Sequence, residues 1–387
     1  MSLRHLYPVV IAAAGLLAAC GNDTTAEPPA ELVDINSTLA VHRLWSEGLG
    51  GSDGETLRLT LGVQGFGDTV YAAGRGGDVR AMDAATGKLR WSTDTDLELS
   101  AGPGVGEGLV VVGTSDGDLV ALEIATGKQR WKTRISGEIL APPLPVGDHV
   151  VLRSVEGRLR SLAATDGKEQ WLVEDVVPRL SLRGTGTPVA ADGNVVVAGF
   201  DTGKVMAVSL DKGETLWQLQ LATPSGRTEL DRLSDVDSAV QISGKDVYAV
   251  GYQGRVAMLS LDNGQMWWSR DLSSYRGLAL DDDQVYVATS EGSVVALRRR
   301  DGAVVWEQKA LARRGLSAPA VVGSAVAVGD FEGYLHFLDR SSGKFVAREH
   351  PGSERIAAPP LVIGDRIYVI DEGGELVAYR VGSATGG

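Results

Sequence analysis

The side chains that most often perform chemistry in proteins are sparse in this sequence and poorly spaced for it. Cys20 is the only cysteine among 387 residues, so the chain has no disulfide or redox pair. The five histidines lack the close spacing of zinc ligands. Asp116-Gly117-Asp118 offers too few ligands for a calcium loop, and Gly104-x-Gly106-x-Gly108 precedes no helix that could complete a phosphate loop. We therefore expect turns at both motifs, and neither a catalytic residue nor a bound metal or cofactor.

Cys20 has a different chemistry available, because it ends an apolar segment at the N-terminus. The run from Val9 to Leu17 has the length of a signal-peptide core and is too short to span a bilayer. Leu17-Ala18-Ala19-Cys20 resembles the lipobox of bacterial lipoproteins, whose cysteine is acylated and becomes the first mature residue. We expect a signal peptide at residues 1–19 and a lipidated Cys20 with a flexible tether at residues 20–38. An ordinary cleavage site followed by an unmodified cysteine is the alternative.

The residue after the cysteine indicates a location for the protein, and the net charge excludes one class of partner. In enterobacterial lipoproteins an Asp after the acylated cysteine causes retention in the inner membrane, whereas this chain has Gly21. That resemblance implies a Gram-negative outer membrane, with the protein lipid-anchored at its periplasmic face. The formal net charge is −13, which repels phosphate backbones and argues against nucleic-acid binding.

The rest of the chain is a repeat of short strands and glycine turns. A turn glycine followed four residues later by Trp recurs at intervals near 40, ending at Trp91, Trp131, Trp171, Trp217, Trp268 and Trp306, while Ala347 stands in the last such position. Each unit contains four short β-branched segments, a pattern typical of propeller blades. We expect each Trp to lie flat on its turn and to wedge between blades.

Eight such units predict an all-β fold, an eight-bladed β-propeller of four-stranded antiparallel blades over residues 39–381. The eighth unit ends after its third strand, Glu375 to Arg380, whereas the segment Val41 to Glu47 precedes the first unit and carries Trp45. We expect the N-terminal strand to pair with that third strand and complete the last blade. Closure of the ring would remove two sheet edges that otherwise promote aggregation.

Two enlarged connections are the candidate functional site. Spacings of 46 and 51 between turn glycines place extra residues in 176–186 and 222–234, on either side of blade four. Both connections should emerge on one face, because they join outer strands to the next inner strands. Leucines and arginines in the first, with aspartates in the second, resemble an apolar centre with a charged rim, as in protein interfaces. The alternative is that the two connections only pack on each other.

The segments Leu180 to Gly184 (LSLRG) and Arg227 to Ser238 (RTELDRLSDVDS) resemble the most distinctive motifs of the BamB family. Members of that family are lipoproteins of the outer-membrane β-barrel assembly machinery with quinoprotein-like propeller repeats. The resemblance implies a scaffold that binds the POTRA domains of BamA and assists outer-membrane protein assembly and insertion. Nascent outer-membrane proteins are a further candidate partner. The contact residues implied by this motif match are Leu180, Leu182, Arg183, Asp235 and Asp237.

Two other functions are compatible with the repeat. Quinone-dependent dehydrogenases share it, but they use a calcium site and a catalytic carboxylate, and many add an adjacent cysteine pair that this chain lacks. A generic protein-binding lipoprotein with another partner is the second alternative. We therefore expect a protein that is not an enzyme.

Overall fold

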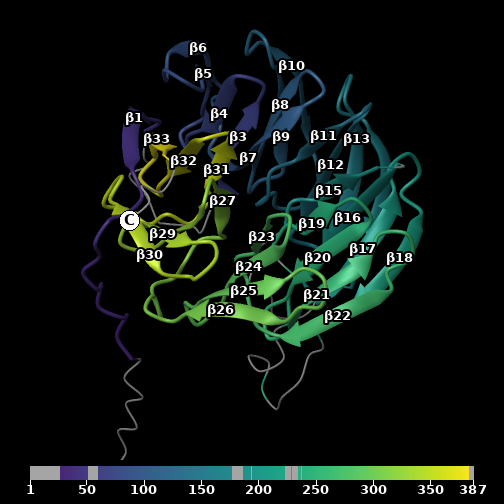
Figure 1. The fold of residues 1–387 in the computed structure, drawn as a ribbon. Coiled ribbons are helices and arrows are strands. Elements are labelled where there is room, and N and C mark those ends of the chain that lie inside the picture. The colour runs from purple at the N-terminus through teal and green to yellow at the C-terminus, as the bar shows by residue number, and fades with distance from the viewer. Residues whose placement is uncertain are drawn as a thin grey trace, which may run out of the picture.

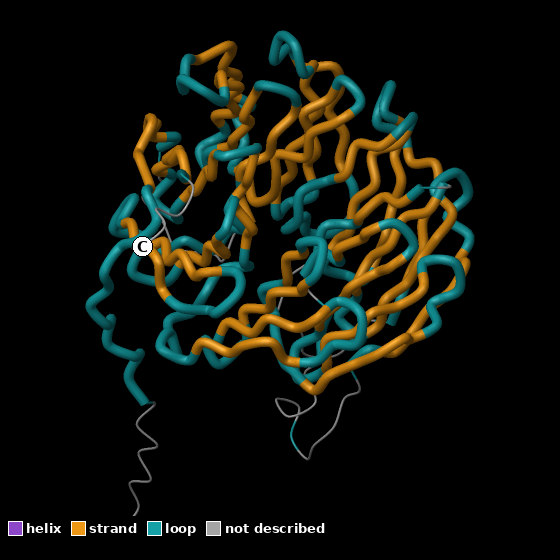
Figure 2. Tube along the Cα trace, in the orientation of Figure 1, coloured by secondary structure: helices purple, strands orange, loops and turns teal. Residues whose placement is uncertain are grey.

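The structure is a computed structural model that describes residues 27–50, 60–176, 186–192, 194–222, 228, 234–236 and 238–382. Every regular element within these residues is a β-strand, as Figure 2 shows. The strands form eight sheets of four antiparallel strands, one of which also carries a short parallel strand, and the sheets surround a common centre (Figure 1). This arrangement confirms the predicted eight-bladed propeller. No helix in the described part of the chain is long and apolar enough to cross a membrane.

Each of blades 1 to 4 consists of four strands that are consecutive in the sequence. The first strand lies nearest the centre of the ring and the fourth lies at the outside (Figure 1). They are β3 (Val63–Phe66), β4 (Thr69–Ala73), β5 (Asp78–Asp83) and β6 (Leu89–Asp94); β7 (Leu99–Gly106), β8 (Leu109–Thr114), β9 (Asp118–Glu123) and β10 (Gln129–Arg134); β11 (Leu144–Val146), β12 (His149–Ser154), β13 (Arg158–Ala163) and β14 (Glu169–Glu174); and β15 (Val189–Ala191), β16 (Val195–Gly199), β17 (Lys204–Ser209) and β18 (Thr215–Gln220). The short β2 (Thr60–Leu61) pairs in parallel with β7.

Blades 5 to 7 repeat the scheme, and blade 8 takes its outer strand from the start of the chain. The strands are β19 (Gln241–Ser243), β20 (Asp246–Val250), β21 (Arg255–Ser260) and β22 (Met266–Asp271); β23 (Leu278–Leu280), β24 (Gln284–Ala288), β25 (Val294–Arg298) and β26 (Val304–Gln308); β27 (Ala320–Val322), β28 (Ala325–Gly329), β29 (Leu335–Asp339) and β30 (Phe345–Glu349); and β31 (Leu361–Ile363), β32 (Arg366–Ile370), β33 (Glu375–Val381) and β1 (Val41–Gly48).

Strand direction alternates within every blade, so the connections between strands lie on two opposite faces of the propeller. Connections from the fourth strand of one blade to the first strand of the next emerge on one face, together with the turns between second and third strands; we call this the loop face. Turns between first and second strands and between third and fourth strands emerge on the opposite side, the turn face. The candidate docking connections therefore belong to the loop face.

The hydrophobic core lies between blades. Middle strands such as β8 and β28 are buried along their whole length, because neighbouring sheets cover both of their faces. One cluster, for example, joins Phe337 of blade 7 to Ile367 and Val377 of blade 8. Outer strands such as β14 alternate between exposed and inward-facing residues. Each blade therefore depends on both neighbours for burial of its apolar side chains.

The repeated Trp residues bind the ring together, but each one lies on the glycine turn of the following blade. The indole of Trp91 in blade 1 covers Gly127 of blade 2, where any side chain would collide with the ring. Its Nε1–H donates a hydrogen bond to the carbonyl of Ile124 at 2.9 Å. The sequence correctly predicted a wedge between blades, whereas the expected contact with the preceding turn of the same blade was wrong.

This geometry explains why Ala347 replaces Trp in blade 7. The next blade is blade 8, whose third strand β33 and fourth strand β1 come from opposite ends of the chain, so no turn joins them. Ala347 packs instead in a cluster with Leu39 and Val381, near the place where the N-terminal segment enters β1. A Trp at this position would have no glycine turn to cover.

Adjacent Trp residues in β22 allow a matched test of the wedge. Trp268 is 8% exposed, covers Gly302 and bonds to the carbonyl of Arg299 at 2.7 Å, whereas Trp267 is 55% exposed. We expect Trp268→Ala to lower the free energy of unfolding by about 3–5 kcal/mol. Trp267→Ala should change it by no more than about 0.5 kcal/mol. Urea denaturation measures both values, and similar losses for the two variants would contradict the assignment of the wedge to Trp268.

The predicted ring closure is confirmed. β1 pairs with β33 in antiparallel register, from Val41 opposite Val381 to Gly48 opposite Glu375. Trp45 of β1 covers Gly87 of blade 1, as the other Trp residues cover their following turns. The N-terminal strand thus completes blade 8 and joins it to blade 1.

The segment before β1 differs from the flexible tether expected through residue 38. Residues 27–40 run along the outside of blade 7, where the amides of Thr38 and Leu39 donate to the carbonyl of Val346 at 2.9 and 3.1 Å. Leu39 is buried in the core between blades 7 and 8. The segment is secured by a few apolar side chains and by hydrogen bonds to its backbone, and its sequence therefore lacks a repeating apolar pattern.

Candidate functional site on the loop face beside blade 4

The two predicted docking connections lie on the loop face, on either side of blade 4. Residues 175–188 join β14 to β15, and residues 221–240 join β18 to β19. This placement confirms that they share a face and flank one blade. They are not the only long connections, however, because residues 49–62 between β1 and β3 span a comparable stretch on the same face. Length alone therefore does not single out the candidate site.

Most residues of the predicted site lie outside the described part of the chain. These are Leu180, Leu182, Arg183 and Asp237, together with the predicted lipid-bearing Cys20. Asp235 is described, and it is fully buried instead of lying exposed in a charged rim. Its backbone carbonyl accepts a hydrogen bond from the amide of Tyr252 in blade 5 at 2.7 Å. Asp235 thus fits a residue that positions its connection better than one that touches a partner directly.

Asp235 is buried because residues 234–236 are wedged between blades 4 and 5. The amide of Val236 donates to the carbonyl of Phe200 in blade 4 at 3.1 Å, and its side chain joins the core between the two blades. At the start of the same connection, the amide of Leu221 donates to the carbonyl of Gly203 at 2.8 Å. Both ends of the second connection are therefore fixed to the turn of blade 4 on the loop face.

An ion pair fixes the start of the first connection to the same turn. The carboxylate of Asp175 accepts hydrogen bonds from Nζ of Lys204 at 2.7 Å and from the hydroxyl of Thr202 at 2.5 Å. Burial alone would raise the pKa of Asp175, but the bonds from Lys204 and Thr202 lower it overall. The carboxylate is therefore ionised at neutral pH and holds the connection against blade 4.

The two connections also touch each other at their C-terminal ends. A Cβ on Gly186 would lie 2.6 Å from the carbonyl oxygen of Ser238, a distance that only glycine tolerates. The described ends of the two connections are therefore in contact beside blade 4. Contact between them also agrees with the packing alternative raised by the sequence, so a test of function must separate docking from packing.

A buried ion pair beneath this surface was missed by sequence reasoning. Arg153 at the end of β12 in blade 3 pairs with Asp201 in the loop-face turn of blade 4, and the two side chains are 0% and 2% exposed. The guanidinium carbon of Arg153 lies 5.2 Å from the centre of the Phe200 ring. The sequence does contain one indication of this pair. Arg153 stands at a repeat position that is glycine in the neighbouring blades, namely Gly113 in β8 and Gly199 in β16. The pair joins the two blades that carry the first connection.

Breaking this pair should be costly, because it leaves a buried charge without its partner. We expect Asp201→Ala to lower the free energy of unfolding by about 3–5 kcal/mol. The double variant with Asp201→Leu and Arg153→Met should recover most of that loss, since apolar replacements remove both desolvation penalties. Urea denaturation of Asp201→Leu, Arg153→Met and the double variant tests this, and losses that simply add would show that the two side chains do not act as a pair.

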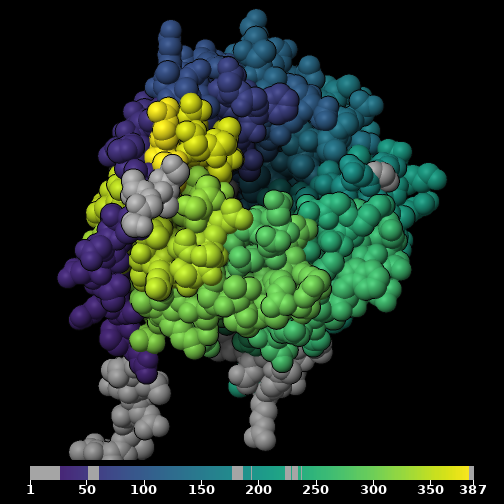
Figure 3. Space-filling model, in the orientation of Figure 1, coloured from purple at the N-terminus to yellow at the C-terminus, as the bar shows by residue number. Residues whose placement is uncertain are grey.

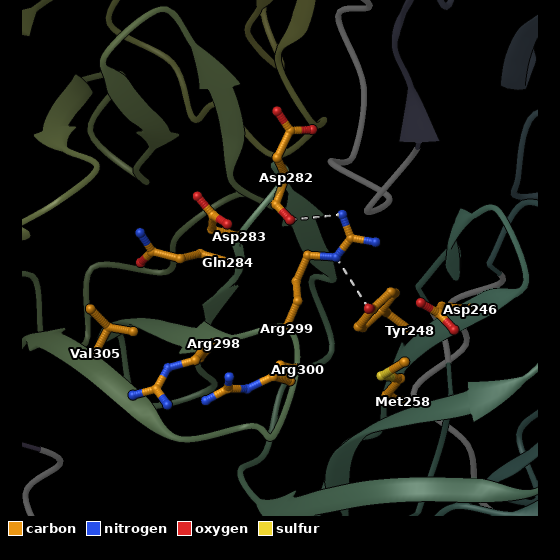
Figure 4. Close-up of a pocket in the computed structure, with 10 residues that line it drawn as sticks. All are labelled: Asp246, Tyr248, Met258, Asp282, Asp283, Gln284, Arg298, Arg299, Arg300 and Val305. Atoms are coloured by element: carbon orange, nitrogen blue, oxygen red, sulfur yellow. Dashed lines mark hydrogen bonds between the residues drawn. The ribbon is translucent and has the colours of Figure 1, made fainter.

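A cavity of about 750 Å³ lies on the turn face between blades 5 and 6, remote from the two connections (Figure 4). Arg299 crosses it, donating to the hydroxyl of Tyr248 at 3.1 Å and to the carbonyls of Asp281 and Asp282 at 2.9 and 3.3 Å. Arg298 is paired with Asp301 at 2.9 Å. The described residues contain no group of three or more His, Cys, Asp or Glu side chains placed to hold a metal ion. The bond from Arg299 to Tyr248 joins blades 5 and 6, whereas the pair of Arg298 and Asp301 stays within one turn of blade 6.

Comparison with known proteins gives one consistent family. The family model described as "Outer membrane protein assembly factor BamB" matches residues 41–98, 75–308 and 291–386. A Pseudomonas aeruginosa protein of that name is 51% identical over 376 residues, which cover 97% of this chain and 98% of that protein. A Xanthomonas campestris protein of the same name is 40% identical over 370 residues, covering 92% of this chain and 90% of the relative.

Solved structures give the same picture at the level of the fold. The crystal structure of BamB from Moraxella catarrhalis has a TM-score of 0.81 and 27% identity, covering 88% of this chain and 100% of that one. A quinohemoprotein alcohol dehydrogenase from Comamonas testosteroni has a TM-score of 0.67 and 15% identity, covering 88% of this chain and 76% of the enzyme. At that identity the likeness to the dehydrogenase shows only a shared propeller fold.

Proposed function

Because this chain belongs to the BamB family of outer membrane protein assembly factors, we propose that it is a non-catalytic scaffold of the outer-membrane β-barrel assembly machinery. In this role it binds the POTRA domains of BamA and assists the assembly and insertion of outer-membrane proteins. A lipid on Cys20 holds it at the periplasmic face of the outer membrane.

The observation that carries the proposal is the anchored pair of connections beside blade 4. Asp175 fixes the start of the first connection, and residues 234–236 fix the end of the second between two blades. The anchored ends place both connections on one face beside blade 4, within reach of a single partner domain. Leu180, Leu182, Arg183 and Asp237 are the proposed contact residues, whereas Asp235 positions its connection from within the fold.

The described charges support a structural use of the propeller in preference to a catalytic one. The arginines of the turn-face cavity bond to backbone carbonyls, to Tyr248 and to Asp301, and the buried Arg153 pairs with Asp201. These side chains join neighbouring strands and blades, so their positions are explained by the stability of the ring. A scaffold accounts for them without a substrate.

Affinity purification from detergent-solubilised outer membranes tests the proposal. The full-length chain, purified through a C-terminal tag, should carry BamA with it, and the complex should persist after high-salt washing if the interface has an apolar centre. Recovery of a different protein in place of BamA would favour the generic binding lipoprotein. Quinone-dependent alcohol oxidation by the purified chain after addition of cofactor and calcium would contradict the non-catalytic part of the proposal.

A further inference from the structure

Residues 27–40 form a strap along the outside of blade 7, seen at the left of Figure 3. Three arginine side chains donate hydrogen bonds to backbone carbonyls of the strap. These bonds run from Arg313 to Pro28 at 2.8 Å, from Arg314 to Ala30 at 3.1 Å and from Arg348 to Val33 at 3.0 Å. Arg313 also pairs with Glu27 at 2.9 Å. The strap is therefore clamped by side chains along its length.

Backbone and apolar contacts hold the same segment. The amide of Ala30 donates to the carbonyl of Ala312 at 3.0 Å. Leu32 packs against the core between blades 6 and 7, and Leu39 is buried in the core between blades 7 and 8. The first residues of the strap contact residues 312–314, which belong to the connection between β26 and β27. The start of the strap therefore lies on the loop face.

The clamp is supported from behind by a buried charge cluster in blade 7. Asp330 pairs with Arg314 at 2.7 Å and with Nε2 of His336 at 2.9 Å. Arg348 donates from Nε to Nδ1 of His336 at 3.1 Å. Burial alone would raise the pKa of Asp330, but its contacts with His336 and Arg314 lower it overall. The ionised carboxylate thus fixes the orientation of Arg314, one of the arginines that grip the strap.

We propose that the strap orients the propeller at the lipid surface and holds the loop-face rim of blade 7 next to the membrane. Only residues 21–26 separate Cys20 from the strap. An extended chain covers at most about 3.3–3.6 Å per residue, so the start of the strap lies within about 25 Å of the acylated cysteine. The radius of gyration of a folded chain of this length is about 20 Å, which corresponds to a body about 50 Å across, so the tether reaches at most about half of the width of the propeller.

Blades 2 and 3 lie across the ring from the strap (Figure 1), so the length of this tether leaves them farther from the acylated cysteine than blade 7. The inference rests on the acylation of Cys20 in the proposed function and is independent of BamA. The proposed partner is the headgroup region of a bilayer. Blade 7 lies closest to it because the chain that leads to the acylated cysteine leaves the propeller beside this blade. The orientation should therefore be present in liposomes that contain no other protein.

Fluorescence quenching on liposomes tests the orientation. Cys20 is the only cysteine, so once it is acylated an introduced cysteine is the only thiol available for a fluorophore. Suitable exposed positions are Ser353 on the loop face beside blade 7, Asp116 on the loop face of blade 2 and Lys344 on the turn face of blade 7. Quenchers attached to lipid headgroups should reduce the emission of a label at Ser353→Cys most strongly. Equal quenching at all three positions would overturn the inference.

Two variants separate the strap from the lipid. Insertion of about 20 Gly and Ser residues between Ala26 and Glu27 gives a flexible, longer tether with an intact strap, and the difference in quenching should be lost. Arg313→Gly with Leu32→Ser should loosen the strap, with the same loss and with faster hydrogen exchange at the amide of Ala30. Arg313 has a φ of 60°, so glycine is accommodated there without backbone strain. An unchanged preference for Ser353 after the insertion would contradict the proposal.

The failure of lipidation has a separate signature. Cys20→Ser should leave the folded chain in solution after centrifugation with liposomes, whereas the acylated chain should sediment. If the acylated chain stayed in solution, or if the serine variant sedimented equally, the proposed anchor and with it this orientation would be wrong. Such a result would leave the binding of BamA untouched, because binding of the purified POTRA domains is measured in solution.

Discussion

A chain that begins at residue 49 should be far less stable than one that begins at residue 41, because only the second retains β1. β1 is the outer strand of blade 8, and Trp45 within it covers Gly87 of blade 1. The indole of Trp45 bonds to the carbonyl of Ala84 at 3.3 Å and contacts Tyr368, with ring centres 5.8 Å apart. Trp45 is partly buried, so its loss alone contributes part of the about 3–5 kcal/mol of unfolding free energy that is typical of a fully buried aromatic side chain. The deletion also exposes β33 as a sheet edge, which promotes aggregation.

Two longer chains provide the controls for this deletion. A chain that begins at residue 27 keeps the strap, and one that begins at residue 41 loses the strap but keeps the closed ring. Thermal unfolding should give a small decrease between these two and a much larger one on going to residue 49. A synthetic peptide of residues 38–50 should restore part of the lost stability by pairing with β33. Equal melting temperatures for the chains that begin at residues 41 and 49 would contradict the closure of the ring by β1.

The architecture could be predicted because each blade repeats the same local signals. Strand, turn glycine and Trp recur near every 40 residues, and the incomplete last unit indicated where β1 belongs. The target of each Trp could not be read in the same way. Local spacing places Trp91 beside the turn of its own blade, but the stacking of blades brings it to Gly127 of the next.

The features that the sequence did not reveal depend on contacts between distant segments. The strap has few apolar residues, and its position depends on Arg313, Arg314 and Arg348, far along the chain. Asp235 lies in a polar segment that reads as exposed, yet backbone hydrogen bonds draw it between two blades. Polar segments fixed by backbone hydrogen bonds leave no periodic pattern, so propensity and hydrophobicity do not identify them.

Charge reversal in the first docking connection should have the largest effect on function. We expect Arg183→Glu to weaken binding of the BamA POTRA domains, because it reverses the charge of a proposed contact residue. Loss of one member of an interfacial charge pair typically costs about 2–5 kcal/mol. At about 1.4 kcal/mol per decade, that is a loss in affinity of roughly 30-fold to 4,000-fold. Asp237→Arg should act in the same direction.

Matched controls come from the turn face and from the core of the connection. Lys128→Glu and Lys344→Glu reverse exposed charges on the opposite face and should leave the affinity unchanged. Asp235→Arg should lower both the melting temperature and the affinity, because a longer charged side chain does not fit at this fully buried position of the connection. Thermal unfolding of every variant separates docking from packing.

The most direct measurement is a calorimetric titration of the purified BamA POTRA domains into the chain and its Arg183→Glu variant. We expect tight, stoichiometric binding by the unaltered chain, and binding weakened at least about 30-fold by a variant with an unchanged melting temperature. Equal affinities for the two folded proteins would show that the connections beside blade 4 are not the docking surface. A variant with a lowered melting temperature would instead show that Arg183 packs within the fold.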